Sequence, residues 1–255
     1  MDLDLTGKVA VVSGAGRGIG RSIAERFVAE GMKVVALDLT APTDLDGATG
    51  LRCDVTSEDD VERAVNETVE QHGGIDVLVN NAGINVEGLT EDLSLDQVRA
   101  AFDVNVIGTF LLSRAVMPTM KQARRGRIIN AASFAAIVPS VGAGIYAASK
   151  AAVVQFTRAL AGEVGPWNIT AHSYAPGMIP TAMNGFATMP AERQEELLGT
   201  LTVRRWGLPD DVADLLCFLA SDRSGYITGT LLDVSGGKLA TQIPSRAYPP
   251  AGGSV

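Results

Sequence analysis

Lys8-Val9-Ala10-Val11-Val12-Ser13, followed at once by Gly14-Ala15-Gly16-Arg17-Gly18-Ile19-Gly20, is the stretch that decides the fold. The apolar run predicts a β-strand, and the amphipathic pattern of residues 21–30, closed by Gly31, predicts a helix. The glycines between them let the backbone turn sharply and approach a ligand, while the new helix points its N-terminus at that ligand. A strand, a tight turn and a helix in this order predict a pyrophosphate site, although an ordinary glycine-rich turn has the same local pattern.

A carboxylate at the end of the next predicted strand distinguishes these two interpretations. That strand covers residues 32–38, and Asp38 follows Gly20 at about the 20-residue spacing at which dinucleotide-binding folds place the acid that binds the adenosine ribose hydroxyls. Because a carboxylate there repels the 2′-phosphate of NADP, the sequence predicts NAD as the preferred cofactor. Arg17, in the glycine turn, could contact a phosphate, so NADP is the weaker alternative.

Strand and helix patterns alternate along the rest of the chain. Further strands are predicted at residues 50–55, 75–80, 127–132, 169–174 and 230–234, and helices at 58–72, 94–120, 146–164 and 209–220. The pattern predicts an α/β fold, a doubly wound parallel β-sheet with helices on both faces, formed by residues 1–237 as a single domain. Residues 238–255 are predicted to be a C-terminal tail that either dangles or packs on a neighbouring subunit.

The composition is that of a compact globular protein and excludes several functions. The 255 residues are 46% hydrophobic and 20% charged, and the net charge is −8. A nucleic-acid-binding protein needs a basic face, and an anionic membrane repels an acidic chain, so neither is a predicted partner. Cys53 and Cys217 lack metal-ligand spacing and are predicted to be buried, reduced and structural, so no metal site is expected. The acidic N-terminus does not resemble a signal peptide, and a soluble cytoplasmic protein is predicted.

Tyr146 and Lys150 form the second informative pattern. Four residues apart in a predicted helix, they would lie on one face, and the ammonium would lower the tyrosine pKa from its usual value of about 10 towards working pH. Tyr146 would then be usable as a general acid or base. A surface pair can have this spacing by chance, but Lys150 ends a segment, residues 128–149, that carries no formal charge. That context favours a functional pair.

These residues belong to a larger set of motifs. The set comprises the turn from Ser13 to Gly20, Asp38, Asp54, Asn80-Asn81-Ala82-Gly83, Asn105, Ser133, Tyr146-x-x-x-Lys150 and Pro176-Gly177-x-x-x-Thr181. In these motifs the sequence resembles the short-chain dehydrogenase/reductase family over nearly its whole length. The resemblance implies a Rossmann fold and a hydride transfer between a nicotinamide ring and a carbonyl or alcohol carbon. It also implies a homotetramer, in which the helices at 94–120 and 146–164 pair with their symmetry mates.

The resemblance implies four catalytic residues, Asn105, Ser133, Tyr146 and Lys150. Tyr146 would act as the general acid or base, and Ser133 would hydrogen-bond the substrate oxygen. Lys150 would hold the nicotinamide ribose and lower the pKa of Tyr146. Asn105 would support a water that relays protons to Lys150.

The resemblance also implies which residues bind the cofactor. Asp54 and Val55 would surround the adenine, residues 81–83 would lie beside the adenosine ribose, and Ile179 and Thr181 would contact the carboxamide or the phosphates. The full predicted set is Ser13, Gly14, Arg17, Gly18, Ile19, Gly20, Asp38, Asp54, Val55, Asn81, Ala82, Gly83, Tyr146, Lys150, Pro176, Gly177, Ile179 and Thr181. Three of them could instead be simple packing residues: Ile19, Val55 and Ala82.

His172 departs from the family pattern, which commonly has asparagine at that position. A strand histidine outside the four matched catalytic positions is predicted to be a structural hydrogen-bonding residue rather than a catalytic group. Ser235, before Gly236-Gly237, stands where the family commonly has aspartate.

Substrate specificity is predicted to lie in residues 178–206, an insertion after the sixth strand that would form a lid. Its apolar members would line a substrate pocket or form the lid's own packing face: Met183, Phe186, Met189, Leu197, Leu198 and Leu201. Neither this segment nor residues 134–141 offers a clear cationic clamp, so the predicted substrate is a neutral secondary alcohol, polyol or ketone. The alternatives are a 3-oxoacyl thioester reductase, an activity that usually runs with NADPH, and a non-catalytic nucleotide-binding scaffold.

Overall fold

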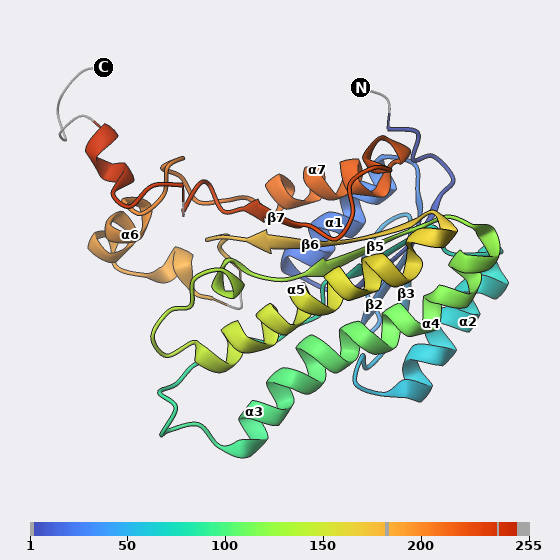
Figure 1. Ribbon diagram of the computed structural model, residues 1–255, viewed down its shortest axis with the longest axis horizontal. Helices are drawn as coiled ribbons and strands as arrows, with labels where there is room; N and C mark the ends of the chain where they lie inside the picture. Colours follow the sequence, from blue (N-terminus) through green and yellow to red (C-terminus); the bar gives the residue numbers. More distant parts are fainter. Residues whose placement is uncertain (1–2, 182–183, 239, 249–255) are drawn as a thin grey trace.

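Seven parallel strands form one sheet in the computed structural model, which describes residues 3–181, 184–238 and 240–248 (Figure 1). The order across the sheet is β3-β2-β1-β4-β5-β6-β7, so the direction of winding reverses between β1 and β4. Folds of this kind bind ligands at the carboxyl ends of the strands at such a reversal. The strands are β1 (Val9–Ser13), β2 (Lys33–Asp38), β3 (Ala48–Arg52), β4 (Val77–Asn80), β5 (Gly126–Ala131), β6 (Ile169–Pro176) and β7 (Leu231–Val234).

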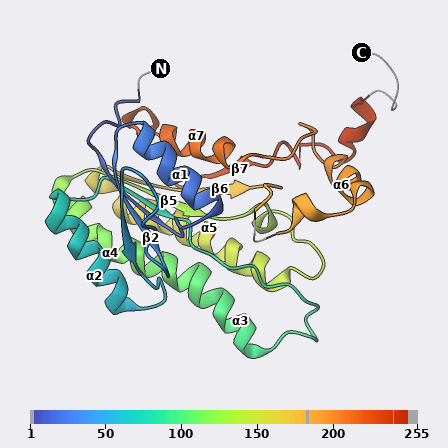
Figure 2. The ribbon, with the colours of Figure 1, turned by 180° about the vertical axis from the view of Figure 1, so that it is seen from behind.

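Helices cover both faces of the sheet, which confirms the predicted doubly wound fold. α1 (Gly18–Ala29) and α7 (Pro209–Ala220) pack on one face, and α2 (Glu58–His72), α4 (Gly108–Ala123) and α5 (Gly144–Val164) pack on the other (Figures 1 and 2). Alternate side chains of each strand point to opposite faces. In β1, Val12 belongs to the core beneath α1 and α7, whereas Val11 belongs to the core on the other face. Burial on both faces explains why the strand sequences are continuous apolar runs.

Element boundaries differ from the sequence prediction at the carboxyl edge of the sheet. α1 begins at Gly18 rather than at residue 21, so the last glycines of the turn form its first helical turn. β3 ends at Arg52 rather than at residue 55. The N–H of Cys53 still donates to Asp38 O, but the Asp54 carboxylate then accepts from the N–H of Thr56 and turns the chain away from the sheet.

The predicted helix at residues 94–120 is interrupted in the structure. α3 (Leu95–Phe102) begins at a capping box between Ser94 and Gln97, a π-helical turn covers Asp103–Ile107, and α4 follows. By length and composition alone, Leu95–Ala123 could cross a membrane, a test that the core helices of soluble proteins also pass. Here the α4 side chains Leu112, Val116 and Met120 are buried in the core against the sheet.

The segment after β6 and the C-terminal tail pack on each other at one end of the molecule (Figure 1). Residues 178–206 include α6 (Ala191–Leu198). In the tail, Pro244 is buried, and the Tyr248 hydroxyl donates to Thr202 O and accepts from the N–H of Arg204. The described residues of the tail therefore do not dangle, because they pack on their own chain; packing of the tail on a neighbouring subunit stays a prediction.

Candidate active site

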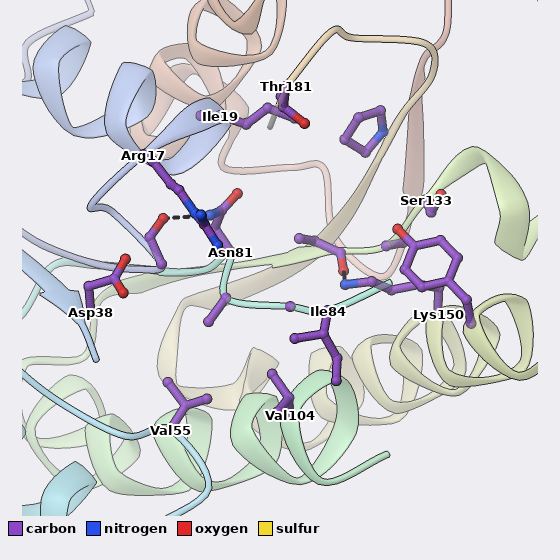
Figure 3. A pocket seen from close by; sticks show the side chains of 18 of the residues that line it. Arg17, Ile19, Asp38, Val55, Asn81, Ile84, Val104, Ser133, Lys150 and Thr181 are labelled. Atoms are coloured by element: carbon purple, nitrogen blue, oxygen red, sulfur yellow. Dashed lines mark hydrogen bonds between the residues drawn. The ribbon is translucent and has the colours of Figure 1, made fainter. Parts of the chain in front are cut away.

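A cavity of about 450 Å³ lies at the carboxyl edge of the sheet and brings most of the predicted site residues together. Asp38 and Arg17 lie at one end of it, and Ser133 and Lys150 lie at the other (Figure 3). Ser13, Gly20 and Asn105 do not line it. The predicted residues that do are Gly14, Arg17, Gly18, Ile19, Asp38, Asp54, Val55, Asn81, Ala82, Gly83, Ser133, Tyr146, Lys150, Pro176, Gly177, Ile179 and Thr181.

The glycine turn forms the wall of the cavity beside α1. Gly14 and Gly18 have φ values of 64° and 59°, in the left-handed region that favours glycine. A Cβ on Gly20 would lie 2.1 Å from Gly14 O, so no side chain fits there. Within the part of the chain that the structure describes, no side chain caps the N-terminus of α1. The turn can therefore present backbone donors to an anion.

Asp38 holds the turn in place as well as facing the cavity. Its Oδ2 accepts from the N–H of Gly16 at 2.8 Å, and its Oδ1 accepts from the N–H of Leu39 at 2.8 Å. A Cβ on Gly16 would lie 2.8 Å from Oδ2, so glycine is required for this approach. Arg17 is exposed and lines the same end of the cavity. Both residues that bear on the choice between NAD and NADP therefore lie at one end of the cavity.

Ser13 and Asn81 connect the glycine turn to the end of β4 by hydrogen bonds. The Ser13 hydroxyl accepts from the N–H groups of Asn81 and Ala82, both at 3.1 Å. The Asn81 amide donates to the carbonyls of Ser13 and Gly14, and its Oδ1 accepts from the Tyr174 hydroxyl at 3.0 Å. The sequence reasoning missed Tyr174, although its place at the carboxyl end of a predicted strand was a usable signal. Burial raises the pKa of Tyr174, so it remains a hydrogen-bond donor.

The wall opposite the glycine turn is more apolar. Val55 is buried and packs against Gly108, where a Cβ would lie 2.7 Å from Val55 Cγ2. Asp54 lines the cavity, but its carboxylate also accepts from the N–H and the hydroxyl of Thr56. Cys53, predicted to be a structural residue, is buried as expected and also lines the cavity; burial raises its pKa to about 11. The thiol is therefore protonated and acts as an apolar wall.

Tyr146 and Lys150 lie on α5, as predicted, but their electrostatics differ from the prediction. Burial raises the pKa of Tyr146, and the hydrogen bond with the Ser133 side chain lowers it by a smaller amount. Lys150 is 4% exposed; its Nζ donates to Ala131 O at 2.8 Å and lies 6.0 Å from the centre of the Tyr146 ring. Burial lowers the pKa of Lys150 to about 8. The predicted downward shift of the tyrosine pKa by lysine is therefore wrong: desolvation dominates at both groups.

Asn105 lies behind the cavity wall, in the π-helical turn. Its Nδ2 donates to Ile84 O at 3.0 Å and to the Ser149 hydroxyl at 2.9 Å, and its Oδ1 accepts from the N–H of Ile84. A Cβ on Gly83 would lie 3.0 Å from Asn105 Oδ1 and 3.2 Å from Lys150 Nζ, so both groups lie beside Gly83. The role of Asn105 in a proton relay stays a prediction. Ser149, which bonds Asn105, was missed by the sequence reasoning.

His172 lies in β6 and does not line the cavity. It is fully buried, its Nε2 lies 3.1 Å from the Thr170 hydroxyl, and burial lowers its pKa to about 4. A neutral histidine held this way fits the predicted structural role.

The apolar side chains expected in a substrate pocket mostly pack elsewhere. Phe186 stacks on Trp206 with ring centroids 5.5 Å apart, and Leu201 is buried. Met183 lies outside the described residues, and none of the described apolar members lines the cavity. Arg204 and Arg205 pair with Glu195 and Asp211. Lys238, which lies outside both segments that were searched for a cationic clamp, reaches over Phe134 and was missed by the sequence reasoning.

Comparison with known proteins identifies the family. The family model described as Enoyl-(Acyl carrier protein) reductase matches residues 14–238, which include both ends of the cavity. The chain belongs to the short-chain dehydrogenase/reductase family. The resemblance expected from the sequence motifs is thereby confirmed, and this short-chain dehydrogenase/reductase is an oxidoreductase.

Relatives of this short-chain dehydrogenase/reductase have names that indicate different activities. An uncharacterized oxidoreductase of Mycobacterium bovis is 38% identical over 243 residues, which are 92% of this chain and 98% of the relative. The 3-oxoacyl-[acyl-carrier-protein] reductase of Vibrio cholerae is 36% identical over 245 residues, with 92% and 98% covered. The structure of ligand-free aldohexose dehydrogenase from Thermoplasma acidophilum matches with a TM-score of 0.89 at 35% identity and covers 94% of this chain and 97% of that one.

The residues of the cavity fit the nicotinamide dinucleotide that the family implies. The glycines let the turn pack tightly against Asp38, Asn81 and Ala82, and the start of α1 offers donors to a pyrophosphate. Asp38 would hold the adenosine ribose, and Lys150 would hold the ribose at the other end. When bound, the nicotinamide would supply or accept the hydride.

The burial of Lys150 predicts a pH-dependent contribution to stability. Its pKa is about 8 in the folded chain against 10.5 for an ordinary lysine, so between these values the unfolded chain binds more protons than the folded chain. The free energy of unfolding of the wild type, minus that of Lys150→Met, should therefore rise with pH by up to about 1.4 kcal/mol per pH unit above the folded-state pKa. Below that pKa this difference between the two proteins should be constant. Reversible urea unfolding of both proteins from pH 7 to pH 10 measures it. A difference that stays flat or falls above pH 8 would contradict the prediction.

Proposed function

We propose that the protein transfers a hydride between NAD(H) and a secondary alcohol, polyol or ketone, with Tyr146 as the general acid or base. One observation carries the proposal: Ser133 and Lys150 lie at one end of a cavity that has Asp38 and Arg17 at its other end (Figure 3), and the Tyr146 side chain hydrogen-bonds that of Ser133. The first group suits proton transfer to an oxygen, and the second suits the adenosine half of a dinucleotide.

Tyr146 and Ser133 supply two hydroxyl groups to one substrate oxygen. In reduction, Tyr146 donates its proton to the carbonyl oxygen as negative charge develops there, and Ser133 donates a hydrogen bond to the same atom. In oxidation, Tyr146 accepts the alcohol proton. Because burial raises its pKa, Tyr146 is protonated at neutral pH, which is the form that reduction needs.

Lys150 is placed to exchange protons near neutral pH. Its pKa of about 8 means that both protonation states are populated under mildly basic conditions. The bond to Ala131 O fixes the ammonium, and Asn105 lies nearby beside Gly83. Lys150 can thus return a proton towards Tyr146, and Asn105 supports that transfer.

The choice of NAD rests on Asp38. Its carboxylate is held by the N–H groups of Gly16 and Leu39, so it cannot swing away from a 2′-phosphate without breaking both bonds. Arg17 lines the same end and would favour the phosphate, but as an exposed side chain it competes weakly with a fixed charge.

The alternative substrate is a 3-oxoacyl thioester. Relatives named 3-oxoacyl-[acyl-carrier-protein] reductase from Vibrio cholerae and Thermotoga maritima favour it, as does the description of the family model. That activity usually runs with NADPH, so Asp38 weighs against it. A non-catalytic scaffold is disfavoured because Tyr146, Ser133 and Lys150 are all present and lie together.

Replacing Tyr146 tests the chemistry. In Tyr146→Phe, kcat should fall about 10²- to 10⁴-fold because the phenol proton is lost. Steady-state rates on a panel of polyols, cyclic alcohols and ketones measure the change. NADH fluorescence titration is the control, since the phenyl ring leaves the dinucleotide site in place. Unchanged turnover across the panel would show that the proposed chemistry is wrong.

Replacing Asp38 tests the cofactor preference. Asp38→Asn keeps the shape but removes the charge, so the ratio of kcat/KM with NAD to kcat/KM with NADP should fall at least about 10-fold. Asp46→Asn, an exposed acid on the loop before β3, is the matched control and should leave the ratio unchanged. A wild-type preference for NADPH would overturn the role of Asp38 and favour the thioester alternative.

We further propose a cytoplasmic homotetramer that assembles through the outer faces of α4 and α5. Ile107 and Phe110 are 44% and 41% exposed on this side, and the Phe110 ring contacts Phe156 of α5 edge-on with centroids 6.1 Å apart. Exposed apolar groups that gather on adjacent helices are typical of interfaces.

Light scattering tests the assembly. The wild type should have about four times the mass of the 26.6 kDa chain, and Phe110→Glu should lower that mass because a charge would be buried at the interface. Tyr226→Glu, at a fully exposed tyrosine, is the control. A monomeric wild type, or a Phe110→Glu mass equal to that of the wild type, would contradict the proposed interface.

A further inference from the structure

Lys238 does not line the cavity, but it contacts residues that neighbour the lining at the substrate end, although it is far from the catalytic residues in sequence. Its Nζ lies 5.2 Å from the centre of the Phe134 ring and 3.9 Å from Met178 Sδ. Phe134 directly follows Ser133, and Met178 stands between Gly177 and Ile179, which both line the cavity. Because β5, β6 and β7 are neighbours, the segments after them meet at one edge. Lys238 is therefore beside the space beyond Ser133 and Tyr146.

The backbone after β7 is built to hold Lys238 there. Gly236 and Gly237 have φ values of 68° and 74°, and a Cβ on Gly237 would lie 2.8 Å from Thr202 Cβ. Gly236 O accepts from the N–H of Val203, and Gly237 O accepts from the Thr202 hydroxyl at 2.8 Å. The Ser235 hydroxyl accepts from the N–H of Lys238. The backbone that carries the Lys238 side chain is thus hydrogen-bonded to the lid segment.

The surroundings of the ammonium lack a counter-charge. The Thr200 hydroxyl is 3.2 Å from Nζ, and the other neighbours are the thioether of Met178 and the ring of Phe134. Within residues 3–181, 184–238 and 240–248 the structure shows no ion pair of Lys238, whereas Arg204 and Arg205 close by are both paired. Burial lowers the pKa of Lys238. A partly buried cation with neutral neighbours is a favourable place for an anion from outside the chain.

We propose that Lys238 binds a carboxylate of the substrate, so that the preferred substrates are hydroxy acids or keto acids. This inference rests on the proposed alcohol and carbonyl chemistry at Tyr146. The substrate oxygen lies at Ser133 and Tyr146, and the remainder extends past Phe134 and Met178 to Nζ. The ammonium has three N–H donors, of which Thr200 Oγ1 and Met178 Sδ take at most two, so a donor remains for an oxygen of a monoanionic carboxylate. A phosphate would call for more donors or a forked guanidinium, and the nearby arginines are paired within the chain.

Matched pairs of substrates that differ only in charge test this assignment. The probes are 2-, 3- and 4-hydroxycarboxylates, each compared with its own primary amide, which has nearly the same shape and no charge. The wild type should prefer the acid at one or more chain lengths. In Lys238→Met that preference in kcat/KM should fall about 10- to 100-fold. The loss should appear in KM for the acid, while kcat for the acid and both constants for the amide change less than about 3-fold.

Two further variants separate charge from packing. Lys238→Arg keeps the charge and should retain most of the preference for the acid. A loss in Lys238→Met that Lys238→Arg does not share then comes from the missing charge, whatever the thermal midpoint of Lys238→Met. Lys121→Met is the matched control, because Lys121 Nζ also lies over an aromatic ring, 4.2 Å from the centre of Trp167, but at the opposite edge of the sheet. The preference should be unchanged in Lys121→Met.

The outcomes distinguish this inference from the proposed function. If neutral alcohols are turned over through Tyr146 but no acid is preferred, or if Lys238→Met keeps the preference, Lys238 has no such role and the proposed function stands. If the wild type turns over neither acids nor neutral alcohols, the proposed function fails. Calorimetric titration of butyrate and butyramide into the NADH-loaded protein then decides about Lys238 alone. Tighter binding of butyrate that Lys238→Met abolishes supports its role, and equal binding overturns it.

Discussion

The backbone at Gly20 passes through a space that admits no side chain, and the arrangement of the site depends on that close approach. A Cβ there would lie 2.1 Å from Gly14 O and 2.4 Å from Asn81 Nδ2. Because α1 can approach so closely, Asn81 can bridge the turn to β4, and Tyr174 can hold Asn81 from β6. One set of contacts thus joins the phosphate-binding turn, the middle of the sheet and the strand that leads to the lid segment. The reversal point of the sheet is rigid before any ligand arrives.

A second set of buried polar contacts positions the reactive end. Asn80 on β4 donates to Asn130 on β5, and Asn130 donates to Thr157 on α5, at 2.8 and 2.9 Å. Asn105 bonds Ser149, which is adjacent to Lys150 on α5. Polar bonds in a core have narrow geometric tolerance, whereas apolar contacts allow a helix to slide or rotate. These bonds therefore fix the rotation of α5, and with it the direction of Tyr146 and Lys150.

The sequence predicted the fold and most of the cavity because both depend on local patterns. Alternating apolar runs and helical periods gave the parallel sheet, and the glycine turn, Asp38 and the Tyr146 and Lys150 pair gave the two ends of the site. What it missed depends on contacts between distant segments. Tyr174 matters only through Asn81, Ser149 only through Asn105, and Lys238 only because two left-handed glycines direct it towards Phe134. The shift of the tyrosine pKa was predicted with the wrong sign because spacing shows a charged neighbour but not the burial of both groups.

Lys150 and Lys238 show how burial can prepare a site for its ligands. Burial lowers the pKa of both side chains, so each ammonium is less stable in the folded chain than in water. Lys150 has a backbone carbonyl as partner and Lys238 has a hydroxyl, and neither supplies a full negative charge. A cofactor that brings ribose hydroxyls to the first and a substrate that brings a carboxylate to the second would relieve both costs. Binding of each ligand would stabilise the folded chain by an amount that grows with the logarithm of its concentration over its Kd, and the two lysines would then help to hold cofactor and substrate in one orientation.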